Sequence, residues 1–314
     1  MRGTGIGVIG VDAAQSLTID PALATRNGGV FANWFVGSLD GNGVLTAANI
    51  APWGVNNLEY RLGGGGTTLT LNPAAGSNQF GGVAGARMII GAAHAVLGYG
   101  AVTFNANGNN NYNGGTVINR AHHYDGGSRG MAVLIQGGAV GTTTQHRTTL
   151  GTGDVDLHGE VRVEGSAGTL VAQDTGGLVN NNAWFFHPGS RIRFDNNTPF
   201  AGAGTAGNRA TGTIGDGGRW GDAAAITLNS AMLEMFGDGT DHIANREVVG
   251  DINVRGGAEV VIRRTGAFWV ELSAGNLNRV GNGTLLVTGM VDATNTANML
   301  GTVASNANSA IPRR

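Results

Sequence analysis

The segment Val155-Asp156-Leu157-His158-Gly159-Glu160-Val161-Arg162-Val163 carries the pattern that decides the fold. Apolar and polar residues alternate on both sides of a central glycine. Side chains of a β-strand point alternately to opposite faces, so the pattern predicts two short strands, each with one apolar and one polar face. Glycine between them supplies the backbone conformations of a sharp corner.

The same alternation recurs along the whole chain in short segments separated by Gly, Asn or Asp. These segments are residues 68–71, 101–104, 155–158, 160–163, 191–194, 226–229, 252–255 and 284–287. Of 314 residues 57 are Gly, and each glycine in a helix interior costs about 1 kcal/mol relative to alanine. This glycine content excludes a helical protein, and the absence of a strict triplet period excludes collagen.

Internal similarity indicates that the short strands stack. Residues 97–104 resemble residues 150–157, and residues 66–71 resemble residues 283–287. A coil of this kind cannot bury its apolar face alone, whereas stacked coils share a continuous core. We therefore predict an all-β parallel β-helix, or β-solenoid, with irregular coils. At roughly 20–25 residues per coil it would have about a dozen coils, with asparagine side chains forming ladders at the corners.

Three regions are expected from composition. Residues 1–60 carry the apolar run 30–36 and would form an N-terminal β cap or the first coils. Residues 61–300 would form the solenoid, and residues 301–314 a flexible tail. The apolar run could instead be a docking surface for identical chains, with Phe31, Trp34, Phe35 and Trp53 as contact residues.

Charge and cysteine content limit the classes of partner and chemistry. The formal net charge is −2, so we expect neither nucleic acid nor an anionic membrane as partner. The chain has no cysteine, which excludes disulfides and cysteine-based sites. It has no apolar run of 18 residues that could span a membrane. Sparse charge also permits identical chains to associate.

The N-terminal residues lack the pattern of a signal peptide. We therefore expect that a signal was removed or that the chain is a segment of a larger protein. The second alternative is favoured because the sequence begins within a predicted strand and ends abruptly at Arg313-Arg314.

Several polar motifs were considered as metal sites. Residues 40–43 (Asp-Gly-Asn-Gly) begin like a calcium loop but lack the later ligands. Residues 215–218 and 237–242 place aspartates in glycine-rich turns, which are more commonly plain turns. His122 and His123 are adjacent, so on a strand they would point apart. We expect no metal and no cofactor.

Catalysis by a β-helix would require carboxylates that converge on one groove. Asp154 and Asp156 share one face of a predicted strand, and Asp238, Asp241 and His242 could add to a groove. The other charged residues are scattered, and the run 63–66 of four glycines lacks the Lys-Ser/Thr of a phosphate-binding loop. We therefore expect that the protein is not an enzyme.

Three segments together resemble the autotransporter-associated β-strand repeat of bacterial surface and secreted proteins. They are residues 281–289 (GNGTLLVTG), residues 111–119 (NYNGGTVIN) and residues 97–104 (LGYGAVTF), and residues 49–55 resemble an element that recurs between such repeats. The resemblance extends in patches over residues 40–290. It implies a right-handed β-helix exported to the cell surface, although the chain lacks the family's C-terminal outer-membrane barrel.

The expected function is that of an extracellular structural β-solenoid at a bacterial surface, acting as scaffold, adhesin or filament subunit. Identical chains, and a surface glycan, are the partners considered. The alternative is a carbohydrate-active β-helix, either a polysaccharide lyase or hydrolase or a domain similar to a phage tailspike.

Overall fold

The computed structural model describes the chain in fifteen segments. They are residues 8–11, 14–15, 33–38, 43–74, 77–81, 83–91, 101–106, 110–120, 133–137, 149–164, 181, 183–195, 223–236, 244–263 and 269–290.

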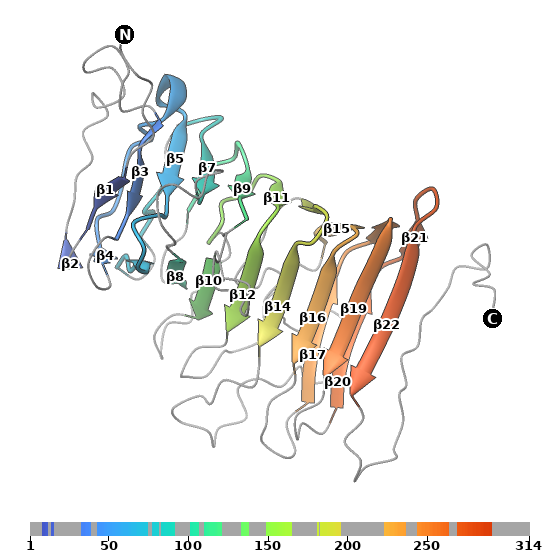
Figure 1. The fold of residues 1–314 in the computed structure, drawn as a ribbon. Helices are drawn as coiled ribbons and strands as arrows, with labels where there is room; N and C mark the ends of the chain where they lie inside the picture. The colour runs from blue at the N-terminus through green and yellow to red at the C-terminus, as the bar shows by residue number, and fades with distance from the viewer. Residues whose placement is uncertain are drawn as a thin grey trace, which may run out of the picture.

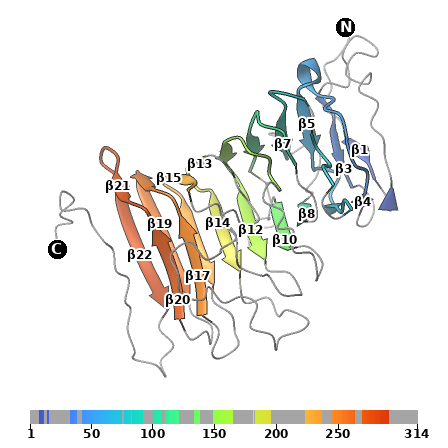
Figure 2. The ribbon, with the colours of Figure 1, turned by 180° about the vertical axis from the view of Figure 1, so that it is seen from behind.

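Two ten-stranded parallel sheets make up most of the described structure, and successive strands along the chain alternate between them (Figures 1 and 2). Sheet A consists, in spatial order, of β1 (Val8–Gly10), β3 (Phe35–Gly37), β5 (Glu59–Leu62), β7 (Arg87–Ile90), β9 (Thr116–Ile118), β11 (Val155–Leu157), β13 (Ala183–Phe186), β15 (Ala225–Asn229), β18 (Ile252–Arg255) and β21 (Leu277–Arg279). Sheet B consists of β2 (Ala14–Gln15), β4 (Gly43–Leu45), β6 (Leu69–Leu71), β8 (Val102–Ala106), β10 (Val133–Gly137), β12 (Glu160–Glu164), β14 (Arg191–Asp195), β16 (Met232–Phe236), β19 (Gly257–Arg263) and β22 (Thr284–Met290).

Each coil therefore contributes one strand to sheet A and one to sheet B, which is the architecture of a parallel β-solenoid. The predicted fold class is confirmed, and all eight alternating segments coincide with strands. Strands β17 (Ala244–Val249) and β20 (Trp269–Ala274) add a two-stranded parallel sheet in two late coils. The described residues contain no α-helix, only a short 3-10 helix, η4 (Val55–Asn57).

The coils are longer and fewer than the sequence predicted. Residues paired in neighbouring coils are 25 positions apart between Ile252 and Leu277, and 42 apart between Trp184 and Ile226. The described strands define ten coils instead of about a dozen. The strands that carry these pairs have only three to five residues, so the extra residues lie in the connections between strands.

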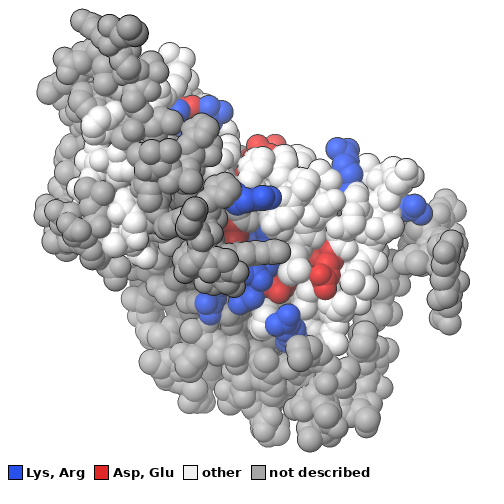
Figure 3. Space-filling view, in the orientation of Figure 1, with Lys and Arg blue, Asp and Glu red and all other residues white. Residues whose placement is uncertain are grey.

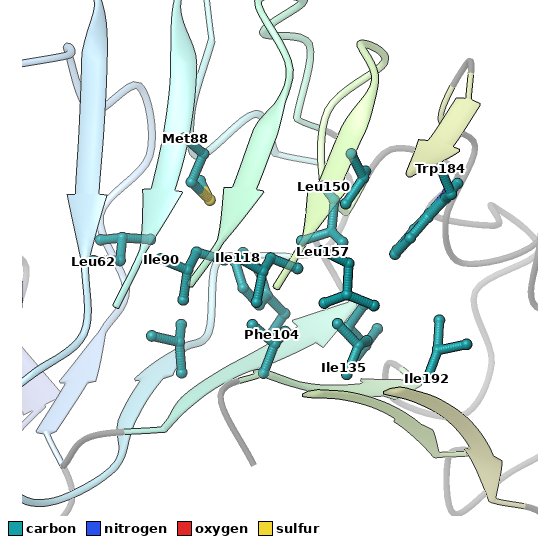
Figure 4. Close-up of a cluster of buried hydrophobic side chains, with 14 of the residues drawn as sticks. Leu62, Met88, Ile90, Phe104, Ile118, Ile135, Leu150, Leu157, Trp184 and Ile192 are labelled. Atoms are coloured by element: carbon teal, nitrogen blue, oxygen red, sulfur yellow. The ribbon is translucent and has the colours of Figure 1, made fainter. Parts of the chain in front are cut away.

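The core fills the space between the two sheets. Inward side chains from successive coils stack in columns. Ile90, Ile118 and Leu157 of sheet A form one such column (Figure 4), and Val161 and Ile192 of sheet B belong to another. All five are fully buried. Each column continues through successive coils, so every inward residue packs against neighbours above and below it in addition to the facing sheet.

Glycines form corners where successive coils approach closely. The run Gly63 to Gly66 has φ angles of 97°, 89°, 90° and 95°, which L-residues with side chains rarely adopt. Gly63 N–H donates to the carbonyl of Val36 at 2.7 Å, and a Cβ on Gly65 would overlap the carbonyl oxygen of Ser38. The glycine run thus shapes a corner of the stack.

Asparagine side chains link neighbouring coils, as predicted, both in turns and on the outer face of sheet A. Asn78 Nδ2 donates to Asn111 Oδ1 at 2.8 Å, and Asn278 Nδ2 donates to Asn253 Oδ1 at 3.1 Å. Asn181 Nδ2 donates to the carbonyls of Leu150 and Gly153 in the preceding coil. These bonds join residues 25 to 33 positions apart, so they hold neighbouring coils together.

Strands of residues 8–62 belong to the same two sheets as the later coils. The expected tail at 301–314 lies outside the described residues.

Two adjacent phenylalanines of β13 provide a test of the stacked core. Phe186 is 1% exposed and points inward, whereas Phe185 is 38% exposed on the outer face. We expect Phe186→Ala to lower the free energy of unfolding by about 3–5 kcal/mol because it leaves a cavity. Phe185→Ala is the matched control and should cost about 1 kcal/mol or less. Urea unfolding measures both, and equal losses would contradict the assignment of the inward face.

Candidate functional site

A network of alternating charges lies on the outer face of sheet B. Arg191 of β14 contacts Glu160 of β12 (Nη2–Oε2, 2.7 Å) and Glu234 of β16 (Nη1–Oε2, 3.3 Å). Arg193 Nε also donates to Glu234 Oε2, at 2.9 Å. Register places Glu160 beside Arg191, and Arg193 beside Glu234. The network therefore ties three neighbouring strands together from outside the core.

Phe236 lies between two arginines at the end of this network. The guanidinium carbons of Arg193 and Arg263 are 4.5 Å and 4.9 Å from its ring centroid. Such cation–π contacts fix long side chains on a partly exposed surface. Figure 3 shows basic and acidic side chains intermixed on the face seen in the orientation of Figure 1. On the described part of this face the two signs are therefore interspersed.

The carboxylates of this network are held by arginines and are not positioned as a general acid and base. Glu234 is 2% exposed and contacts two guanidinium groups, and the Glu160 side chain is also largely buried against Arg191. A glycosidase acid needs an accessible carboxyl beside its substrate. The arrangement instead balances charge across stacked strands.

A second ion cluster lies on the outer face of sheet A. Glu59 of β5 accepts from Arg61 Nε at 2.8 Å and from Arg87 Nε of the next coil at 3.0 Å. Its own carbonyl accepts from the backbone N–H groups of Trp53 and Gly54. Burial raises the pKa of the Glu59 carboxyl, but the hydrogen bonds and charges of Arg87 and Arg61 outweigh burial, so this pKa is lowered overall. Glu59 therefore holds the turn before β5 to two strands.

Two histidines stack at the corner between the sheets. The imidazoles of His158 and His187 have centroids 3.8 Å apart and planes inclined by 9°. His187 Nε2 lies 3.2 Å from Asp156 Oδ1. Burial lowers the pKa of His158, as do the neighbouring His187 and Arg120, while Asp156 opposes this shift. The alternation of apolar and polar residues gives no sign of this pair. Aligning residues 155–158 (VDLH) with residues 184–187 (WFFH) would have placed both histidines in one register position.

The aromatic residues expected to contact identical chains have different positions. Trp53 is 1% exposed in the core, and its Nε1 donates to the carbonyl of the partly exposed Trp34 at 3.1 Å. Phe35 is 3% exposed on the outer face of sheet A, with the Arg61 guanidinium carbon 5.5 Å from its ring centroid. Phe35 and Trp53 therefore pack within their own chain. Phe31 lies outside the described residues.

Trp53 belongs to a buried aromatic cluster. The ring of Tyr60 lies 6.1 Å from Trp53, 5.1 Å from Phe80 and 5.7 Å from Tyr112, between centroids. Tyr112 Oη is 2.7 Å from Thr116 Oγ1, whereas the buried hydroxyl of Tyr60 has no hydrogen-bond partner among the residues that the structure describes. Burial raises the pKa of Tyr60 to about 12. The cluster packs three of the early coils against one another.

Most polar motifs considered as metal or catalytic sites lie outside the described residues. These are Asp40 to Asn42, His122 to Asp125, residues 215–218 and residues 237–242. Asp156 points outward from β11 beside His187, and Asp154 precedes this strand on the surface. Among the described residues, no group of three His, Cys, Asp or Glu side chains could hold a metal ion. None of the helices in this part of the chain is long and apolar enough to cross a membrane.

Comparison with known proteins gives no relative. No protein-family model matches the chain, nor does any curated protein or solved structure.

The Glu59 cluster predicts a specific loss of stability in acid. The folded pKa lies below the ordinary value of 4.5, so the folded chain binds fewer protons than the unfolded chain near that pH. The contribution of Glu59 is therefore complete above pH 4.5 and is lost as pH falls through the folded value. Glu59→Gln removes one partner of an ion pair whose arginine, Arg87, is half exposed. Because solvent screens such a pair, we expect the variant to lower the free energy of unfolding by about 2 kcal/mol at pH 7 and by less at pH 3.

Urea midpoints measured from pH 7 to pH 3 test this prediction. Glu259→Gln is the control because Glu259 contacts only Thr288 among the described partners, and it should change the midpoint little. Parallel curves for wild type and Glu59→Gln would show that Glu59 makes no pH-dependent contribution.

The two tyrosines of the aromatic cluster predict opposite effects of removing a hydroxyl. Tyr60→Phe removes a buried group without a partner, so we expect unfolding free energy to stay constant or to rise by about 1 kcal/mol. Tyr112→Phe breaks the bond to Thr116 and should lower it by about 1–2 kcal/mol. Thermal or urea unfolding of both variants checks the sign. A larger loss for Tyr60→Phe than for Tyr112→Phe would contradict the described packing.

Proposed function

We propose that this chain is a structural scaffold, a stiff β-solenoid whose function is mechanical. The observation that carries the proposal is the continuity of its ladders, since both sheets pair in register through ten successive coils. The core columns follow the same register without a break between domains. Stacking of this kind distributes a load over many backbone hydrogen bonds and a continuous apolar core.

The contacts of the acidic residues favour a scaffold over a carbohydrate-active enzyme. In the described part of the chain, Glu59, Glu160 and Glu234 each contact arginines that join neighbouring strands. These carboxylates attract arginines of neighbouring coils and so link the coils outside the core. A hydrolase or lyase would need such groups open to a sugar chain. The ion pairs on these outer faces therefore favour a role in holding the coils together.

We place the scaffold outside the cell, at a bacterial surface, as an adhesin or filament subunit. The resemblance of residues 97–104, 111–119 and 281–289 to surface-protein repeats supports this location, and the absence of cysteine is compatible with it. Stability from a long ladder suits a protein that works without disulfides.

Association of identical chains end to end is the mode of assembly that we favour. Strands β21 and β22 are the last of their sheets, so each has one unpaired backbone edge among the described strands. On β22, Leu286 is 58% exposed and Val287 is 45% exposed. Edges of this type are templates for pairing. The first strands, β1 and β2, end the same two sheets with the same polarity, so a second copy can extend both ladders in parallel.

Electron microscopy and sedimentation of the purified chain test the scaffold and its assembly. We expect filaments or a sedimentation coefficient that rises with concentration, and Leu286→Glu should abolish the rise. Leu58→Glu is the matched control because Leu58 is 36% exposed beside η4, away from the β22 edge. A monodisperse monomer at high concentration would contradict self-association, and cleavage of a polysaccharide by the chain would contradict the scaffold.

A further inference from the structure

The stacked histidines belong to a column of residues at one corner of the solenoid. Ile118, Leu157, Phe186 and Leu228 occupy one inward register position in four successive coils. The residue that follows each of them therefore falls at the corner between sheet A and sheet B. These corner residues are Asn119, His158, His187 and Asn229.

The charged groups around the two imidazoles can balance one positive charge but not two. Asp156, two residues before His158, lies 3.2 Å from His187 Nε2. Arg120, from the segment after β9, also acts on His158 and donates from Nη2 to the carbonyl of Pro188 at 2.6 Å. A second imidazolium would face the first across 3.8 Å, with the Arg120 guanidinium close by. Like charges at this distance repel each other.

We propose that the His158–His187 stack is a proton-operated latch, which joins two coils at neutral pH and releases their corner in acid. The stack holds while at most one ring is charged. Protonation of both rings separates them, because the described contacts of the pair supply one carboxylate, Asp156, for two positive charges. This inference concerns the corner alone and does not depend on the proposed scaffold function.

The direction of the pH effect follows from the protonation of His158. Burial, His187 and Arg120 lower its pKa below the ordinary value of 6.5. Between the folded pKa of His158 and pH 6.5, the folded chain binds fewer protons than the unfolded chain, so the free energy of unfolding rises with pH. The contribution of the neutral His158 to the free energy of unfolding is complete above pH 6.5 and is lost as pH falls through the folded pKa of His158.

The backbone bonds nearest the latch are the ones that acid should expose. His187 N–H donates to the carbonyl of Leu157 at 2.9 Å, and His158 N–H donates to the carbonyl of Ile118 at 2.8 Å. Both bonds join neighbouring coils at the corner. Val280 N–H makes the equivalent bond to Val254 three coils beyond His187, so it serves as an internal reference.

Titration of the imidazole proton signals by NMR in the full chain tests the coupling. The variants His158→Asn and His187→Asn assign the signals, and asparagine already occupies the same corner position in the coils on either side. We expect His158 to titrate about half a pH unit or more higher in His187→Asn than in wild type, because a repelling partner has been removed. An unchanged titration of His158 in that variant would overturn the coupling.

Hydrogen exchange tests the release. Below the folded pKa of His158, protection of the His187 amide in wild type should fall about tenfold or more relative to Val280, which signals local opening. The double variant His158→Asn/His187→Asn should keep the same ratio from pH 7 to pH 4 at the equivalent amide. The same loss of protection in the double variant, or constant protection in wild type, would overturn the proposal.

Discussion

Parallel pairing in register between successive coils is the constraint on which the rest of the structure depends. Once Leu157 pairs with Phe186, every neighbour of these residues is placed above its counterpart in the next coil. Inward positions must then be apolar in every coil. Outward side chains of successive coils lie next to each other, so they must be compatible in charge and size. The chain satisfies this with apolar columns inside, amide ladders at the corners and paired charges outside.

Charge pairing on the outer faces follows from the same constraint. Like charges directly opposite on paired strands are destabilising. Glu160 faces Arg191, and Arg193 faces Glu234, so these neighbours attract each other. Arg162, which faces Arg193, departs from this pattern. So do the stacked histidines, two identical titratable groups at adjacent places in one column. Their stability in that position depends on their charge, which makes the corner sensitive to protons where the Asn-Asn ladders are not.

Alternation was enough to predict the strands whose apolar residues face inward, such as those containing Leu69 and Leu71 or Ile226 and Leu228. It failed for β5, where Glu59 is buried because its partner Arg87 lies 28 positions along the chain. It also failed for Phe35, whose exposed fraction depends on Arg61 stacking above its ring. Coil length was underestimated because connections between strands carry no periodic signal. The His158–His187 pair required knowledge of the register, since its members are 29 positions apart in sequence.

A scaffold of stacked coils should resist extension coil by coil, and a pulling experiment on single molecules measures this most directly. The chain has no native cysteine, so handles can be attached at Val55→Cys and Asn282→Cys, both exposed positions near opposite ends of the described stack. The account predicts stepwise release of segments of 25 to 42 residues, the spacing of paired residues in neighbouring coils, at about 3.4 Å per residue. Featureless extension at low force would contradict a mechanically coupled solenoid.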